Sequence, residues 1–167
     1  MYQSSDLVLY GIHGVCKITA IETKTVNKKQ IRYYVLQPVN QNSTTFFVPA
    51  DNEAALSKMR PIMTKNEIDD LLSANCDVSG LWIADENKRK QQYRELIVSG
   101  DRVALLQMIR VLDLHKKEQQ TAGRKFHQCD ENFMRDAIKL LDEELSVVLN
   151  MDPCDVRQYV AEKMSSK

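Results

Sequence analysis

The spacing of apolar residues changes after Val48-Pro49, from short alternating runs to longer runs with helical spacing. Before that point, runs rich in β-branched and aromatic residues are separated by turn-forming residues, and such runs predict β-strands. The predicted strands cover residues 7–10, 15–23, 31–36 and 44–49. Four or five short strands spaced by about ten residues predict a small, strongly bent sheet or barrel.

The second predicted strand shows the alternation most clearly. Cys16, Ile18 and Ala20 fall on one face of residues 15–23, and Lys17 and Thr19 fall on the other. This assignment follows from the period of two that side chains have along a regular strand.

After residue 50 the apolar residues recur with the period of an amphipathic helix. The predicted helices are a short one capped by Asp51 that runs through Leu56 and Met59, one behind a Thr64/Glu67 capping box, two over about 83–98 and 101–119, a long one from Asp130, and a last one from Asp152-Pro153. The prediction is therefore an α+β protein. Its domains are a β-domain over residues 1–52, a connecting helical segment over 53–80 and a helical domain over 81–167.

The composition is that of a globular protein, with 43% hydrophobic and 28% charged residues. No apolar run approaches the roughly 18–20 residues that span a bilayer. Residues 1–6 do not read as the start of a signal peptide. We therefore expect a cytoplasmic protein that does not enter a membrane. Its four cysteines are far apart and are expected to stay reduced; they are Cys16, Cys76, Cys129 and Cys154.

The net charge of zero hides an uneven distribution. Residues 86–125 carry ten Lys/Arg and five Asp/Glu, a net of +5, whereas residues 53–85 and 126–167 are net −3 and −4. A local basic window is what contact with phosphate requires. A solvated helix face with i,i+4 ion pairs has the same composition. Charge alone leaves both interpretations open.

The sequence offers little for catalysis. It contains no phosphate-binding loop, dinucleotide fingerprint or nucleophile elbow. His115, His127 and Cys129 carry metal-ligating atoms, but their spacing matches no standard zinc pattern. We therefore expect a protein that is not an enzyme and that holds neither a metal nor a cofactor.

Trp82 is the only tryptophan and precedes the basic stretch Lys88-Arg89-Lys90. One interpretation is a packing residue that ties the following helix to the bundle. The other is an aromatic wedge against a base step, with the basic side chains on neighbouring phosphates.

Two series of short motifs follow one another along the chain. The first is Asp6-Leu7-Val8-Leu9-Tyr10, His13-Gly14-Val15, Ile21-Glu22-Thr23, Tyr34-Val35-Leu36 and Val48-Pro49. The second is Trp82, Tyr93-Arg94, Ser99-Gly100-Asp101, Ile109-Arg110-Val111-Leu112, Ala122-Gly123 and residues 140–145. In order and spacing they resemble the CarD/CdnL family of transcription regulators, whose RNA-polymerase-interacting domain also occurs in the transcription–repair coupling factor.

The resemblance implies a Tudor-like, SH3-like β-module that binds the β subunit of bacterial RNA polymerase. It also implies a helical domain that contacts promoter DNA just upstream of the −10 element. In the family, a tryptophan wedges into the minor groove at the upstream edge of the melted bubble and stabilises the open complex without catalysis.

Carried onto this chain, the polymerase-binding residues are Thr23, Lys24, Thr25 and Phe47. The DNA-binding residues are Trp82, Lys88, Arg89, Lys90, Arg94, Arg124 and Lys125. The implied protein is a monomer that associates with the nucleoid through polymerase and contacts DNA largely independently of its sequence.

Three departures from the family pattern bear on these assignments. Tyr10-Gly11 stands where the family often has Tyr-Pro. Phe47 replaces an arginine of some relatives, which predicts a more apolar polymerase face. The stretch from Trp82 to Ser99 is longer by about four residues, close to one helical turn, so Trp82 is either a wedge on a longer helix or a packing residue. The alternative function is a polymerase-docking adaptor whose helical domain binds another protein.

Overall fold

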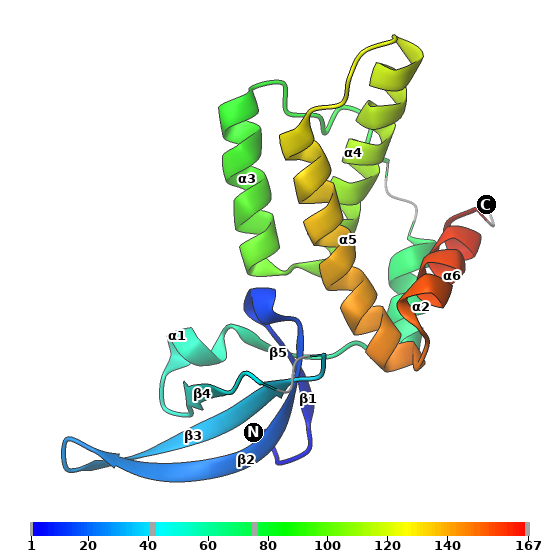
Figure 1. Ribbon diagram of the computed structural model, residues 1–167. Coiled ribbons are helices and arrows are strands. Elements are labelled where there is room, and N and C mark those ends of the chain that lie inside the picture. Colours follow the sequence, from blue (N-terminus) through cyan, green and yellow to red (C-terminus); the bar gives the residue numbers. More distant parts are fainter. Residues whose placement is uncertain (1, 41–42, 75–76, 166–167) are drawn as a thin grey trace. The chain divides into compact units, whose positions relative to one another are not determined.

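The computed structural model describes residues 2–40, 43–74 and 77–165, and the chain divides into two compact units (Figure 1). The first unit, Met1–Met63, holds an antiparallel sheet, and the second, Thr64–Lys167, is helical. The predicted α+β class, with a β-module before a helical domain, is confirmed. Cys76 lies outside the described residues.

Five antiparallel strands make up the sheet, in the order β4-β3-β2-β1-β5. They are β1 (Leu7–Tyr10), β2 (Val15–Val26), β3 (Lys29–Pro38), β4 (Phe46–Pro49) and β5 (Met59–Pro61). A short 3₁₀ turn, η1 (Gly11–His13), follows β1, and a short helix, α1 (Glu53–Leu56), precedes β5. Because β5 pairs with β1, residues 53–61 belong to the sheet unit, whereas the sequence pattern groups them with the connecting segment.

The helix expected between Asp51 and Met59 is shorter than predicted. Its N-cap is Asn52, whose side-chain oxygen accepts a hydrogen bond from the Ala55 N–H at 3.1 Å, and the helix ends at Leu56. Met59 lies in β5 instead and is buried in the sheet core. The three-residue spacing between Leu56 and Met59 fits one face of a helix, but a short apolar run of this kind is equally compatible with a buried strand.

A register shift in β2 decides which side chains of the hairpin face the core. Ile18 pairs with Leu36 but Ala20 pairs with Val35, so Thr19 is an extra residue in a β-bulge. Leu36 and Val35 point to opposite faces, and so do Ile18 and Ala20. The prediction that Cys16, Ile18 and Ala20 share one face is therefore wrong at Ala20.

The β2–β3 hairpin is long, and its tip reaches beyond the rest of the sheet (Figure 1). Its two-residue loop, Asn27-Lys28, has positive φ angles of 50° and 63°. Both central residues of a type I′ turn have positive φ, and the twist of this turn matches that of the flanking strands. The core lies at the other end of the hairpin and consists of buried side chains from all five strands. They are Val8, Cys16, Ile18, Tyr34, Leu36, Val48 and Met59.

The second unit consists of α2 (Lys65–Ser73), α3 (Glu86–Ser99), α4 (Arg102–Thr121), α5 (Gln128–Leu149) and α6 (Pro153–Ser165). The predicted capping box is confirmed, because Thr64 and Glu67 each accept a hydrogen bond from the other's backbone N–H. Asp85 and Asp101 cap α3 and α4 with their side chains. α5 begins before the residue predicted to start it, so Asp130 lies inside its first turn and is buried.

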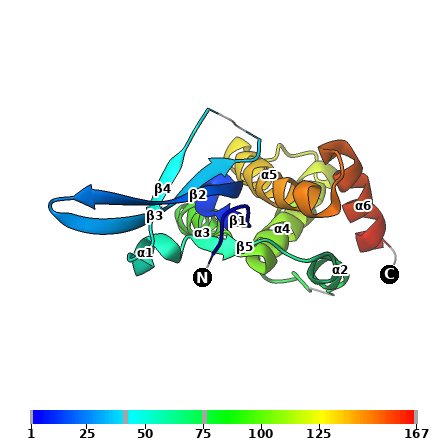
Figure 2. The ribbon, with the colours of Figure 1, turned by 90° about the horizontal axis from the view of Figure 1, so that it is seen from below.

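Helices α3, α4 and α5 pack against one another, while α2 and α6 pack together and against α5 (Figure 1, Figure 2). The α2–α6 contact is polar as well as apolar. Tyr159 donates a hydrogen bond to Asp69 at 2.6 Å, and the Lys163 ammonium lies 2.9 Å from the same carboxylate. These contacts anchor the last helix, whose Val156 is fully buried.

Tyr93 of α3 is buried against Phe133 of α5, with the rings in an edge-to-face arrangement at 5.8 Å. Its hydroxyl has no hydrogen-bond partner within the part of the chain that the structure describes. Burial raises the pKa of Tyr93 to about 12, since the phenolate would lose its hydration. The ring therefore contributes packing, while its hydroxyl costs stability.

We predict that Tyr93→Phe leaves the free energy of unfolding unchanged or raises it by up to about 1 kcal/mol at neutral pH, because it removes a buried, unsatisfied hydroxyl. A folded-state pKa above the unfolded value means that the wild type keeps its stability below pH about 10 and loses part of it as pH rises through about 12. Tyr93→Phe should lose less over that window. The measurement is denaturant unfolding of the wild type and of Tyr93→Phe at neutral pH and near pH 12.

Tyr159→Phe is the matched control, because its hydroxyl has a partner in Asp69 and its removal should cost about 1 kcal/mol. A Tyr93→Phe protein that is less stable than the Tyr159→Phe protein would contradict the prediction.

Candidate functional site

The sheet unit presents a mixed apolar and charged surface on the face opposite its core. Cross-strand pairing aligns Glu22 with Tyr33 and Lys24 with Ile31, and Phe47 lies beyond them on β4. The Lys24 ammonium sits 3.6 Å from the centroid of the Phe47 ring and 3.3 Å from the Glu22 carboxylate. We call these five residues the sheet patch. Phe47 is its most prominent apolar member, with 46% of its surface exposed.

The four predicted polymerase-binding residues do not share one face. Lys24 and Phe47 come together in the sheet patch. Thr23 pairs with Arg32 and Thr25 with Gln30, so both threonines project from the other side of the hairpin. The bulge at Thr19 does not restore a common face, because consecutive residues beyond it still alternate.

Trp82 is half-buried and is held through the face of its indole ring. The imidazole of His115, from α4, stacks on it with 3.6 Å between ring centroids and an interplanar angle of 17°. The Arg89 guanidinium carbon lies 4.4 Å from the indole centroid. Phe126, just before α5, lies 6.3 Å from the His115 ring. We call Trp82, Arg89, His115 and Phe126 the tryptophan cluster.

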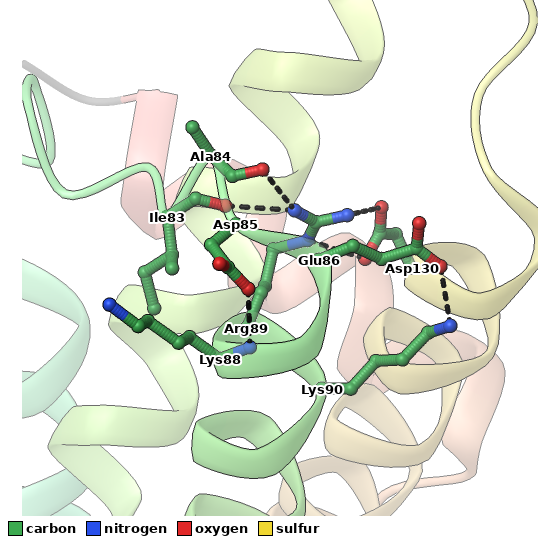
Figure 3. A network of polar contacts seen from close by, with 8 residues as sticks. All are labelled: Ile83, Ala84, Asp85, Glu86, Lys88, Arg89, Lys90 and Asp130. Carbon is green, nitrogen blue, oxygen red and sulfur yellow. Dashed lines mark hydrogen bonds and ion pairs between the residues drawn. The ribbon is translucent and has the colours of Figure 1, made fainter.

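Arg89 is the anchor of this cluster (Figure 3). Its guanidinium donates two hydrogen bonds to the Asp130 carboxylate, at 2.9 Å and 3.0 Å. It also donates to the backbone carbonyls of Ile83 at 2.8 Å and Ala84 at 3.5 Å. Burial by itself lowers the pKa of Arg89, but the hydrogen bonds and charge of Asp130 more than offset it, so the pKa is raised and the side chain stays ionised.

This geometry corrects the sequence-based assignment of Arg89. Only 4% of Arg89 and 1% of Asp130 are exposed, so the guanidinium cannot reach a phosphate. Its donors are already directed at a carboxylate and at backbone oxygens. Arg89 joins α3 to α5 instead of contacting a ligand.

The other predicted basic residues lie at the surface of the helical unit. Lys88 and Arg94 are exposed on α3, and Arg124 and Lys125 are exposed in the α4–α5 loop next to Phe126. Within the described residues, these four cations make no ion pair. Lys90 is half-buried and paired with Glu86, which raises the pKa of Lys90 and lowers that of Glu86 (Figure 3). Lys90 is therefore a weaker candidate for phosphate contact than Lys88. The Lys88 side chain is exposed and points away from Arg89 and Asp130 (Figure 3).

The contact between His115 and Phe126 brings the α4–α5 loop close to Trp82. The first turn of α3, which carries Lys88, and the α4–α5 loop, which carries Lys125, lie at the same end of the helical unit (Figure 1). Arg94 is six residues further along α3 than Lys88, or about 9 Å along the axis. Sequence reasoning selected these cations but missed His115, Phe126 and Asp130 as the residues around Trp82.

His115 is committed to the Trp82 stack, and no group of three His, Cys, Asp or Glu residues among the described residues could hold a metal ion. No helix found in that part of the chain is both long and apolar enough to cross a bilayer.

Comparison with known protein families addresses the sheet unit. Residues 2–63 match the family model described as the CarD-like/TRCF RID domain. The N-terminal unit is a CarD-like/TRCF RID domain. The match ends at Met63, where the first compact unit also ends. This family consists of RNA-polymerase-interacting domains. RNA polymerase is therefore a partner of the N-terminal unit, and the role of that unit is protein interaction, not catalysis.

We predict that Asp130→Ala destabilises the helical unit by about 3–5 kcal/mol, because it leaves the Arg89 charge buried without a counter-ion. The double variant Arg89→Met/Asp130→Leu should lose much less, since it removes both charges and keeps the volume. Urea unfolding followed by far-UV circular dichroism measures both. Asp136→Ala, an exposed acid on the same helix, is the control and should cost under about 0.5 kcal/mol. A double variant as unstable as Asp130→Ala would contradict this account.

Proposed function

We propose that this protein is a bacterial transcription regulator that binds the β subunit of RNA polymerase and upstream promoter DNA near the −10 element, and stabilises the open complex. The observation that carries the proposal is the pairing of a RID domain with a helical unit that has a half-buried tryptophan before α3 and exposed cations on α3 and in the α4–α5 loop. The RID domain is the tether to polymerase, and the helical unit is the DNA-contacting part.

The sheet patch is the proposed contact for the β subunit. Protein–protein contacts of high energy are enriched in aromatic residues surrounded by polar groups. Phe47 provides the exposed ring, and Lys24 both orients that ring and adds a charge. Thr23 and Thr25, on the other side of the hairpin, are proposed to contribute only at its margin.

The proposed DNA contact combines Trp82 with Lys88, Arg94, Arg124 and Lys125. Basic side chains on phosphates position a protein without reading sequence, and an aromatic ring against an unstacked step opposes reclosure of the duplex. Lys90 is a secondary member because Glu86 already neutralises it. The exposed part of the half-buried indole is the part available to the edge of the bubble.

A tether makes so small a DNA interface sufficient. Binding to polymerase turns the DNA contact into an intramolecular event at high effective concentration. Weak, sequence-independent contact then suffices, which is compatible with a net charge of zero over the whole chain.

A second candidate follows from the stacking of Trp82. An indole held by His115 and Arg89 can equally be a packing residue, and the neighbouring Leu81 is 48% exposed. The helical unit would then bind another protein while the RID domain docks on polymerase. DNA affinity that is unchanged in both Trp82→Ala and the triple variant Lys88→Gln/Arg124→Gln/Lys125→Gln would favour this candidate.

For the polymerase contact, we predict that Phe47→Ala weakens binding to purified bacterial RNA polymerase by about 1–3 kcal/mol, the range expected for loss of an aromatic anchor. Ile21→Ala is the matched control, because Ile21 is 42% exposed on the opposite side of the hairpin and should leave affinity unchanged. Titration calorimetry with polymerase core enzyme is the measurement. Equal affinities of the two variants would refute the assignment of the sheet patch.

For the DNA contact, we predict that Trp82→Ala shortens the lifetime of the open complex roughly 5- to 150-fold, as expected for loss of about 1–3 kcal/mol of base–aromatic stacking. Lifetime is measured by competitor challenge of preformed complexes on a promoter that reverts quickly without the factor. Leu81→Ala, at an exposed neighbouring position outside the tryptophan cluster, should retain the wild-type lifetime. An unchanged lifetime in Trp82→Ala would refute the proposed role of Trp82 as a wedge at the edge of the melted DNA.

A further inference from the structure

We propose that His115 is a positioning residue for Trp82, acting together with Arg89 to hold the indole in one placement. The inference rests on the proposed function, in which Trp82 meets the edge of the melted DNA. It assigns a role to a histidine that belongs to neither the polymerase surface nor the basic residues.

The first step is the geometry of the stack. His115 lies on α4, whereas Trp82 lies in the segment that leads into α3, so the contact joins two separate parts of the helical unit. A centroid separation of 3.6 Å at 17° is close, nearly parallel ring packing. The imidazole is itself confined, with Glu118 at 3.6 Å and the Phe126 ring at 6.3 Å.

The second step is the fixing of the backbone next to the indole. Residues 82–84 lie outside any helix or strand, between Leu81, whose N–H bonds to the Val78 carbonyl, and Asp85, the N-cap of α3. Arg89 provides hydrogen bonds to this segment, because its guanidinium donates to the carbonyls of Ile83 and Ala84 while Asp130 fixes the guanidinium itself. With the backbone held by Arg89 and the ring face held by His115, Trp82 has little freedom left.

The third step is the consequence for binding. A side chain that is ordered before it meets its target does not lose that conformational entropy on contact, so affinity and residence time increase. Arg89 cannot be tested alone, because its loss leaves Asp130 buried and uncompensated. His115 is half-buried and carries the same positioning role without that cost, which makes it the residue to vary.

The direct test uses intrinsic fluorescence, because Trp82 is the only tryptophan in the chain. In the full-length protein, His115→Leu should raise the iodide quenching constant of Trp82 by at least about twofold, within the two- to tenfold range that an aromatic pair contributes. His115→Phe keeps a ring at this position and should restore the wild-type value. His127→Leu, an exposed histidine at the start of α5, is the matched control. Quenching in His115→Leu equal to that in His127→Leu would overturn the proposal.

The functional test repeats the open-complex lifetime with the same variants. His115→Leu should shorten the lifetime while His115→Phe retains it. A lifetime unchanged in His115→Leu but shortened in Trp82→Ala would overturn the positioning role in function. If Trp82→Ala itself has no effect, the proposed DNA wedge fails, and the quenching comparison alone then decides whether His115 positions the indole. Should His115→Leu not fold, as judged by far-UV circular dichroism, His115→Gln removes the ring from the same position and is subject to the same outcomes.

Discussion

The buried ion pair between Arg89 and Asp130 is the interaction on which the helical unit's candidate site depends. Removing two charges from water is costly, and the cost is recovered only when geometry and hydrogen bonding are nearly complete. Here the guanidinium is bidentate to the carboxylate, and its remaining donors reach the carbonyls of Ile83 and Ala84. Because few arrangements of α3, α5 and residues 83–84 satisfy all these contacts, the pair fixes the backbone that follows Trp82.

The same solution recurs at the other end of α5. Arg102, the first residue of α4, is bidentate to the buried Glu144 at 2.6 Å and 2.8 Å. Asp130 and Glu144 are about four helical turns apart, so both carboxylates project from one side of α5. Helix α5 therefore holds an arginine from the start of each of the two preceding helices. Such pairs add little net stability compared with apolar packing, but an arrangement that leaves them unpaired is strongly disfavoured. We infer that they select one packing of α3 and α4 on α5.

Local signals in the sequence identified most of the elements, and long-range pairing explains what they missed. Thr64 and Glu67 indicate the start of α2 in the sequence, because all the residues of a capping box lie within four positions of one another. The bulge at Thr19 has no such signal, since it arises from how β2 and β3 register against each other. Lys88, Arg89 and Lys90 read as one basic run, yet successive helix residues point about 100° apart. The partner that draws Arg89 inward lies 41 residues away, beyond the reach of any local pattern.

The division of the chain into a RID domain and a helical unit bears on how much the second unit must do under the proposed function. A protein that finds DNA from free solution needs many phosphate contacts, and its affinity then falls steeply with salt. A unit delivered by polymerase needs only enough contact to hold one ring at the edge of the bubble. Under the proposed function, Trp82 together with the exposed cations on α3 and in the α4–α5 loop meets that smaller requirement. Under the proposed function, the placement of Trp82 therefore matters more than the amount of positive charge on the unit, because a misplaced ring loses the DNA contact while the tether still maintains the effective concentration.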